Sequence, residues 1–202
     1  MNGADLFTFL QDADFYRDMH ETAARQLPPG DGRTWLDVGC GPGVLARIAA
    51  ARGYSVRGID CSEAMIGAAK RLAAERRVTV EFEVSDLKRE FDRGRRYDVV
   101  SASSLLVVLP SPKAGLAQLM ELVKPSGIVL VIEATERMSR LRALRMIATQ
   151  RLGSRSYMLL AWSMGRSGRA LPDTMFPEEP GSLPAVKLLD GLATARIMRG
   201  RP

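Results

Sequence analysis

The stretch WLDVGCGPG, Trp35–Gly43, constrains this chain more than any other part of its sequence. An apolar run predicts a buried strand, and three glycines within the next five positions predict a tight turn. In α/β proteins, such a turn opens the first helix and holds a nucleotide. Asp37 adds a carboxylate at the tip of this strand, so the sequence has to explain what kind of nucleotide tolerates it.

Short β-rich runs alternate with helical segments, which predicts a largely parallel sheet covered on both faces. The strands we expect are Thr34–Val38, Ser55–Asp60, Val78–Val84, Tyr97–Ala102 and Ile128–Glu133. The expected helices between them lie in 43–53, 62–77 and 111–127. Ser62 suits a helix N-cap, and Gly53, Pro125 and Gly127 suit helix ends.

The pattern changes after residue 133. We expect a helix over 136–152, a dense apolar patch at 156–164 and a Pro- and Gly-rich loop at 168–184. Residues 185–199 then predict a β-hairpin that turns at Asp190-Gly191. An antiparallel hairpin at the end of a parallel sheet is unusual and informative.

Composition predicts one domain in a reducing compartment. The 202 residues are 46% hydrophobic, enough for a single full-sized core. No apolar run is long enough for a membrane span, and the N-terminus lacks the basic start of a secretory signal. We therefore expect a cytoplasmic protein, with Cys40 and Cys61 as buried small residues rather than a redox pair.

The positive charge lies in the last third of the chain. Residues 134–202 hold 12 Lys/Arg and 5 Asp/Glu, a net of +7, and residues 1–133 hold 17 and 18, a net of −1, which together give the overall +6. Two interpretations stay open, a solvated Arg-rich face and a docking face for an anionic partner such as phospholipid or RNA.

The glycine turn does not match the phosphate-binding motifs. A Walker loop needs a Lys-Ser/Thr pair after its last glycine, where this chain has Val44 and Leu45. A dinucleotide fingerprint needs a small residue at the position of Val44. Asp37 would also repel a pyrophosphate but attract a cation. S-adenosylmethionine, with its sulfonium and ammonium groups, fits this site, and the glycines let the main chain approach its amino-acid part.

The motifs DVGCGPG at Asp37–Gly43 and VRGIDCSEAMI at Val56–Ile66 resemble those of the class I S-adenosylmethionine-dependent methyltransferases. Within that family, the chain is most similar to the small-molecule and quinone-type subgroup. The resemblance covers roughly Trp35–Glu133 and extends to the terminal hairpin. It implies an α/β fold with a Rossmann-like, seven-stranded, mostly parallel sheet of order 3-2-1-4-5-7-6, in which strand 7 is antiparallel.

The resemblance also implies roles for single residues. Asp60 would bind the ribose hydroxyls, with a helix-capping role as the alternative. Met65 would pack on the adenine or else serve as core. Asp86 and Leu87 would meet the adenine edge, unless Asp86 is an ordinary loop acid. The full set of expected cofactor-binding residues is Tyr16, Asp37, Gly39, Cys40, Gly41, Pro42, Gly43, Asp60, Cys61, Ser62, Met65, Ser85, Asp86, Leu87, Ser101, Ala102 and Ser103.

Methyl transfer is an in-line displacement that mainly needs alignment and exclusion of water. A general base is required only for a protonated acceptor, and the candidates are His20 and Glu133. A surface or capping role is the other interpretation of His20. Tyr16 lies one helical turn before His20, so the two would share a face. We expect no metal, because no His/Cys/Asp cluster is present.

The acceptor should be chosen by the C-terminal part of the chain. Met138, Leu141, Leu144, Ala148 and Leu152 form a helical stripe. We expect this stripe to pack on the sheet and the apolar patch to roof the acceptor pocket. The alternative is peripheral membrane contact through the basic segment 137–169. Either arrangement favours a hydrophobic acceptor.

The sequence thus predicts one methyltransferase domain in four parts: an N-terminal helical lid (1–33), a cofactor-binding core (34–133), an acceptor-site segment (134–183) and a terminal hairpin (184–202). It would use S-adenosylmethionine, releasing S-adenosylhomocysteine, to methylate a small apolar or aromatic molecule. An RNA or protein methyltransferase and a non-catalytic cofactor-binding scaffold are the alternatives. We do not expect nucleic acid as a partner, since no binding module or set of stacking aromatics is evident. The sequence leaves the oligomeric state open.

Overall fold

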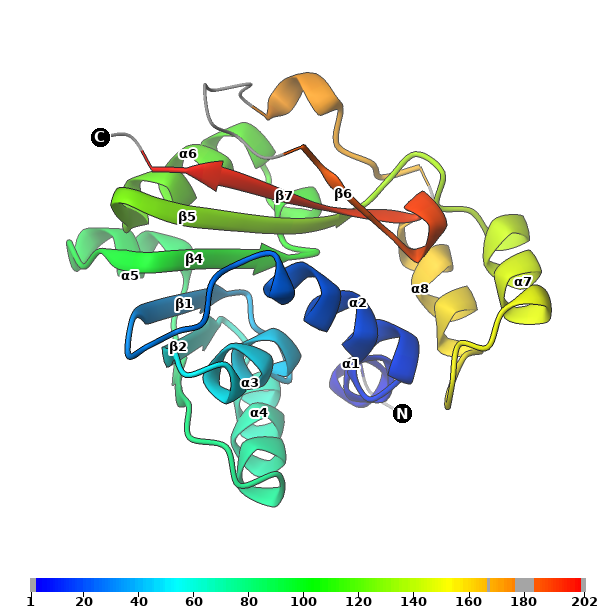
Figure 1. Cartoon of the computed structure of the whole chain (residues 1–202), viewed down its shortest axis with the longest axis horizontal. Helices are drawn as coiled ribbons and strands as arrows, with labels where there is room; N and C mark the ends of the chain where they lie inside the picture. The colour runs from blue at the N-terminus through cyan, green and yellow to red at the C-terminus, as the bar shows by residue number, and fades with distance from the viewer. Residues whose placement is uncertain (1–2, 167, 177–183, 201–202) are drawn as a thin grey trace.

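The sheet has the strand order that the sequence predicts. The computed structural model describes residues 3–166, 168–176 and 184–200. Within them, seven strands form one sheet of order β3-β2-β1-β4-β5-β7-β6 (Figure 1). The strands are β1 (Thr34–Val38), β2 (Ser55–Asp60), β3 (Glu81–Val84), β4 (Tyr97–Ser103), β5 (Val123–Ala134), β6 (Val186–Leu188) and β7 (Ala193–Arg199). The β1–β5 pairings are parallel, whereas β7 runs antiparallel to β5 and β6, so the predicted mixed sheet is confirmed.

Helices cover both faces of this sheet. They are α1 (Gly3–Gln11), α2 (Asp14–Arg25), α3 (Val44–Ala51), α4 (Glu63–Glu75), α5 (Leu87–Asp92), α6 (Pro112–Leu122), α7 (Arg140–Thr149) and α8 (Met158–Arg166), with short 3₁₀ turns η1 (Leu106–Val108), η2 (Asp173–Met175) and η3 (Leu189–Gly191). Successive side chains of each strand point to opposite faces of the sheet, so the protein has two hydrophobic cores. Trp35 and Leu130 belong to the core beneath α2 and α3, and Leu36 and Val131 belong to the core beneath α6. Among the helices described, none is long and apolar enough to cross a membrane.

Several element boundaries differ from expectation for local reasons. The helix expected within 111–127 is α6, which ends at Leu122, and β5 starts at Val123. Pro125 disfavours helix at the residue before it. The helix expected over 136–152 spans only Arg140–Thr149, since the Ser139 side chain caps it by accepting from the Arg142 amide. Strand β3 is also shorter than expected and begins at Glu81. Part of the predicted loop, 177–183, lies outside the described residues.

The N-terminal helices and α7–α8 lie beyond the carboxyl ends of the parallel strands (Figure 1). The sequence predicted a helical lid over 1–33 without helix bounds, and an apolar patch of undefined form at 156–164. The structure adds α1, and the patch forms α8. In this arrangement α1 contacts both α4 and α8, so the first helix bridges the cofactor-binding core and the C-terminal segment.

The expected helical stripe of α7 is wrong in part. Leu141 is 78% exposed and Leu144 is 50% exposed, so neither packs on the sheet. Ala143 and Met146 are the buried residues of α7 instead. Ala143 and Met146 are three positions apart, so they lie on one face of α7, and this is the face that is buried.

Close packing fixes the start of α3. Gly43 has φ +80°, and a Cβ at this position would lie 2.7 Å from the Phe82 ring. The same ring covers Gly58 of β2. Phe82 is buried, so β3 packs tightly over the glycine turn. Gly67, in the middle of α4, has open space around it and an ordinary helical φ.

We therefore predict opposite effects for two Gly→Ala substitutions. Gly43→Ala should lower the free energy of unfolding by about 1–3 kcal/mol, because it combines a left-handed backbone with a clash against Phe82. Gly67→Ala should raise it by about 0.5–1 kcal/mol, as expected for a helix interior. Urea unfolding of both variants measures the difference, and equal effects would contradict this packing.

Candidate functional site

A cavity of about 360 Å³ opens at the carboxyl ends of β1, β2 and β4. Parallel α/β sheets hold their ligands at this edge, where the strand order reverses. Ten residues expected from the sequence line it: Gly39, Gly41, Asp60, Cys61, Ser62, Met65, Ser85, Asp86, Leu87 and Ser103. The chain positions of these residues range over about 60 positions, so the fold assembles one site from four loops.

Asp60 links two of these loops. One carboxylate oxygen accepts a hydrogen bond from the Gly41 amide at 2.9 Å, and the other accepts from the Ser62 amide at 2.9 Å. Ser62 itself caps α4 by accepting from the Met65 amide at 3.3 Å. A carboxylate has about four acceptor positions, so two backbone bonds leave capacity for ligand hydroxyls. Asp60 thus holds the cavity wall and remains available to a ligand.

The glycine turn is held from outside by two side chains. The amide of Val44, at the start of α3, donates to Gln11 of α1 at 3.0 Å. Arg47 is buried and donates to the carbonyl of Pro42 at 2.5 Å. Gln11 also lies against Gly41, where a Cβ would come within 3.1 Å of its amide nitrogen. The N-terminal helix therefore lies directly on the turn.

Asp37 lies beneath the turn. Its side chain is 2% exposed and accepts a 2.7 Å hydrogen bond from Ser101, which in turn accepts from the indole N–H of Trp35 at 2.7 Å. Burial raises the pKa of Asp37 to about 7, even though the Ser101 bond favours the ionised form. Its charge therefore changes near neutral pH. Of the other expected residues, Tyr16, Cys40, Ser101 and Ala102 are also buried.

The end of the cavity beside β2 and β3 is more polar. Asp86 caps α5 by accepting from the Arg89 amide at 2.8 Å, and its side chain is half exposed. Ser85 is buried with its hydroxyl unpaired among the described groups. Met65 and Leu87 supply the apolar surface here. This end can accept a flat polar group with an apolar face.

The other end is apolar and contains residues that the sequence did not reveal. Phe7, Leu105, Val108, Leu109 and Arg166 line it. A second cavity of about 170 Å³ adjoins it and shares Phe7 and Arg166. Its other walls come from α1 and α8: Leu10, Met158, Ala161, Trp162 and Gly165. The expectation that the apolar patch would roof a pocket matches this geometry, but the sequence analysis assigned no residue of α1 to the pocket.

His20 is fully buried, so its interpretation as a surface residue is wrong. Its Nδ1 lies 2.7 Å from the carbonyl oxygen of Tyr16, which can only accept, so Nδ1 carries the proton. In the neutral ring, Nε2 then accepts from the Ser103 hydroxyl at 2.8 Å. Burial lowers the pKa of His20 to about 4. The neutral imidazole of His20 is thus hydrogen-bonded to Ser103, which lines the cavity.

Tyr16 and His20 share one face of α2, as predicted, with ring centroids 4.5 Å apart. Tyr16 also meets Trp162 edge to face at 5.5 Å. The rings of Tyr16 and Trp162 are both buried, and the Tyr16 hydroxyl hydrogen-bonds to Ser103, which lines the cavity. These contacts fasten α2 to α8 behind the site.

Glu133 is turned away from solvent. It is 5% exposed and accepts from the amide of Leu106 at 2.8 Å, which holds the 3₁₀ turn after β4. Burial raises the pKa of Glu133 to about 7, and Arg166 opposes this shift. Glu133 positions the loop that carries Leu105 and Val108.

One of the two cysteines is buried as expected, and the other is not. Cys40 is buried, and burial raises the pKa of its thiol, so it has no thiolate character. Cys61 is exposed and lies at the cavity, which corrects the expectation that both are buried. Cys61 follows the end of β2, where the chain turns into α4 at the open edge of the sheet.

The fold and the cavity together define an α/β protein with a glycine turn after β1 and an acid, Asp60, at the end of β2. The profile of the family described as "Methyltransferase domain" matches residues 10–168. The chain therefore belongs to that family, and its strand order is that of the class I S-adenosylmethionine-dependent methyltransferases.

Individual relatives agree with this assignment. The ubiquinone biosynthesis O-methyltransferase of Coxiella burnetii (strain Dugway 5J108-111) is 32% identical over 96 residues, which are 48% of this chain and 41% of the relative. The protein of the same name from Paraburkholderia phytofirmans is 39% identical over 101 residues, covering 48% and 43%. The match thus spans less than half the length of these relatives. In structure, the magnesium protoporphyrin IX methyltransferase of Synechocystis PCC 6803 aligns with all of this chain and 85% of its own, with a TM-score of 0.55 and 20% identity.

The buried state of His20 predicts a pH dependence of stability. Its folded pKa of about 4 lies below the ordinary 6.5, so the unfolded chain binds its proton more readily. The stability that neutral His20 contributes is present above pH 6.5 and is lost as pH falls toward 4, about 3 kcal/mol in all. Wild type should lose about that much more than His20→Gln between pH 7 and pH 4, as measured by urea unfolding.

The comparison with His20→Gln is needed because two carboxyls act in the opposite sense. The raised pKa values of Asp37 and Glu133 stabilise the fold at low pH, and this stability is lost as pH rises toward 7. Both groups are present in both proteins, so their effect cancels. Parallel pH profiles for the two proteins would contradict a buried neutral His20.

Proposed function

We propose that this chain transfers a methyl group from S-adenosylmethionine to a small apolar or aromatic acceptor. The observation that carries the proposal is the shape of the cavity, with an acid and polar groups at the β2–β3 end and an apolar extension toward α1 and α8. A nucleoside fits the first end, and a hydrophobic acceptor fits the second. S-adenosylhomocysteine would be the released product.

The cofactor would lie across the carboxyl ends of β1 and β2. In this arrangement Asp60 accepts from the ribose hydroxyls, in addition to its bonds to Gly41 and Ser62. Met65 and Leu87 flank the adenine, and Asp86 accepts from its exocyclic amine. The glycine turn approaches the methionine part, and Asp37 beneath it supplies negative charge once it ionises near pH 7.

The acceptor would enter from the side of α1 and α8. Leu105, Val108, Leu109 and Phe7 provide apolar contact, which favours a ring or chain without many charges. Among the described residues, Arg166 is the positively charged side chain that lines both cavities. Its guanidinium donates a hydrogen bond of 3.2 Å to the Ser104 carbonyl. This placement favours an acceptor with one hydroxyl or carboxylate beside its apolar body.

Ser103 and His20 would receive the proton of a hydroxyl acceptor. As the oxygen attacks the methyl carbon and the carbon–sulfur bond breaks, the acceptor proton moves to Ser103 Oγ. The Ser103 proton moves at the same time along the existing hydrogen bond to His20 Nε2, whose lone pair accepts it. The products are the methyl ether, neutral S-adenosylhomocysteine and a buried imidazolium, whose proton returns through the Ser103 hydroxyl to water in the cavity. The bond from Nδ1 to Tyr16 keeps the ring in the required tautomer.

Ser103→Ala should reduce kcat about 10- to 100-fold and change the KM for S-adenosylmethionine much less, because it removes the proton path but only one of the side chains that line the cavity. The matched control is Ser111→Ala, which removes a serine that caps α6, away from the cavity. A loss confined to KM would contradict the proton relay.

Asp60→Asn should weaken S-adenosylmethionine binding by about 1.5–3 kcal/mol, a typical loss for hydrogen bonds to a charged group. In wild type, affinity should also increase as pH rises through about 7, where Asp37 ionises, and Asp37→Asn should abolish this increase. Calorimetric titration measures both effects, with the surface acid variant Asp92→Asn as control. If neither variant binds more weakly, the cofactor site is elsewhere.

The acceptor class is tested with methyl-labelled S-adenosylmethionine and fractionated cell extract. We expect label in small molecules that partition into organic solvent. Label in RNA or protein would overturn the small-molecule proposal and favour the basic C-terminal third as a docking face. Binding of the cofactor without any labelled product would favour a scaffold role. We also propose a cytoplasmic location, where the cofactor is made and used.

A further inference from the structure

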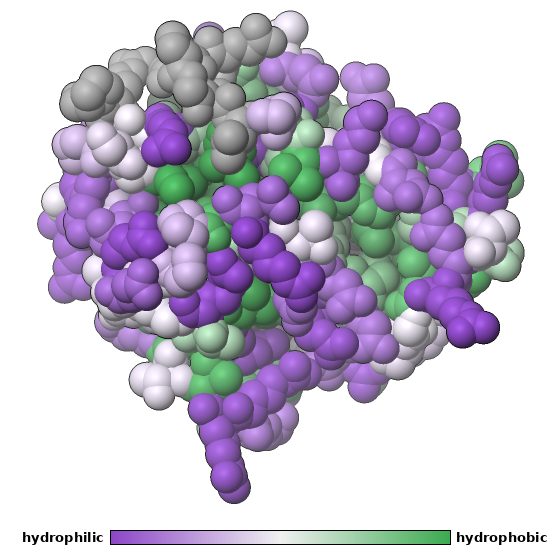
Figure 2. Space-filling view, in the orientation of Figure 1, coloured by the Kyte–Doolittle hydropathy of each residue, from purple (hydrophilic) through white to green (hydrophobic). Residues whose placement is uncertain are grey.

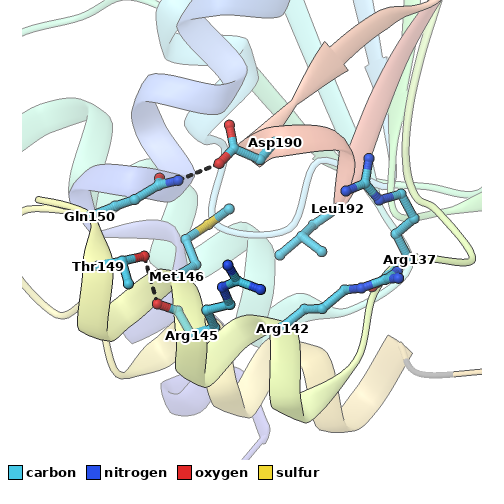
Figure 3. A pocket seen from close by; sticks show the side chains of 8 residues that line it. All are labelled: Arg137, Arg142, Arg145, Met146, Thr149, Gln150, Asp190 and Leu192. Carbon is cyan, nitrogen blue, oxygen red and sulfur yellow. Dashed lines mark hydrogen bonds between the residues drawn. The ribbon is translucent and has the colours of Figure 1, made fainter.

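A pocket outside the methyl-transfer site is built from arginines. It lies between α7 and the η3 turn of the terminal hairpin and has a volume of about 410 Å³ (Figure 3). Arg137, Arg142 and Arg145 line it together with Asp190. Figure 2 shows a hollow with apolar residues at its base on this side of the molecule, bordered by hydrophilic residues. Neither the cofactor nor the acceptor cavity includes any of these arginines.

The three guanidinium groups are not neutralised by the protein. Within the described part of the chain, no carboxylate oxygen lies within 4 Å of any of them. Asp190 is the acid that lines the pocket, and it is hydrogen-bonded to the Gln150 amide (Figure 3). Three cations against one acid leave a net charge of +2 around the hollow. Like charges that converge in this way repel one another, and a bound anion removes that repulsion.

Local contacts direct two of the arginines into the pocket. Arg142 donates to the carbonyl of Arg137 at 3.2 Å, which draws its guanidinium across the mouth. The guanidinium of Arg137 lies against Gly191, where a Cβ would approach Nη1 to 3.0 Å. Gly191 therefore leaves room for Arg137. The Thr135 hydroxyl donates a hydrogen bond of 2.5 Å to the Gly191 carbonyl, which fixes the turn. The hairpin turn and the chain entering α7 thus shape one site together.

The floor and the walls differ in character. Met146 and Leu192 are buried and form an apolar floor, whereas Arg145 and Thr149 extend along the exposed face of α7 (Figure 3). Planar guanidinium forks match the oxygens of a phosphate group and bind it in a bidentate way. A hydrated cation or a neutral sugar would gain nothing from this charge.

We propose that the α7–η3 pocket binds a phosphate group. The group belongs either to a soluble phosphorylated molecule or to a phospholipid headgroup. Leu141 and Leu144 are exposed on the same helix, so a membrane surface is one source of this chemistry. The site is independent of the methyl-transfer cavity, and it gives the basic C-terminal third of the chain a specific role.

The test uses pyrophosphate as the soluble probe and vesicles of phosphatidylglycerol in phosphatidylcholine as the lipid probe. The site variant is Arg142→Gln with Arg145→Gln, which removes two guanidinium groups from one wall. The matched control is Arg140→Gln with Arg151→Gln, which removes the same charge from exposed positions that do not line the pocket. All four side chains are exposed, and thermal unfolding verifies that the proteins remain folded.

We expect the site variant to bind at least one probe about tenfold more weakly than wild type, with the control close to wild type. Loss of pyrophosphate binding identifies a soluble ligand, and loss of vesicle binding alone identifies a headgroup; both support the phosphate site. Equal losses in site variant and control would show a general charge effect and overturn the proposal. It would also be overturned if wild type binds neither probe at low salt.

Discussion

The carboxylate of Asp60 is the contact on which the rest of the site depends. It joins the amide of Gly41 in the glycine turn to the amide of Ser62 at the start of α4. β1 and β2 are paired in register, so one acid at the end of β2 reaches both turns. A backbone hydrogen bond from the Cys40 amide to the Ile59 carbonyl, at 2.9 Å, is a second link between the glycine turn and the end of β2. Asp60, for which the sequence left both ribose binding and helix capping open, therefore builds a wall of the cavity through its bond to the start of α4.

Behind the cavity, the protein keeps several titratable groups in a dry environment. Burial moves the pKa of Asp37 and Glu133 upward to about 7 and that of His20 downward to about 4. All three are therefore close to neutral at the low end of the physiological range, which reduces the cost of burying them. Each is also hydrogen-bonded, to Ser101, to the Leu106 amide and to Ser103 respectively. This shell aligns the turn after β4 and fixes the tautomer of the histidine.

The sheet and half of the cavity could be predicted from sequence because their signals are local. Apolar runs that end in Gly39–Gly43 and Asp60 mark strand ends, and parallel topology brings those ends together. Phe7 and Arg166 could not be found in this way, since they reach the site through the packing of α1 and α8 across the molecule. The burial of His20 was missed for a related reason: α2 has an amphipathic pattern, but only its packing against α3 and the contact of His20 with Ser103 of β4 reveal which polar residue is enclosed. Helix α7 shows most clearly what sequence cannot predict. The apolar stripe over 138–152 suggested one buried face, but Leu141 and Leu144 are exposed and Ala143 and Met146 are buried.

Side-by-side calorimetric titration of the full chain with S-adenosylmethionine, NAD⁺ and ATP tests the central claim most directly. The glycine turn over Asp37 and the acid at Asp60 should favour the positively charged sulfur nucleoside. The expected result is saturable binding of S-adenosylmethionine with one site per chain and no measurable heat from the two phosphorylated nucleotides. Saturable binding of NAD⁺ or ATP, with no response to S-adenosylmethionine, would contradict it.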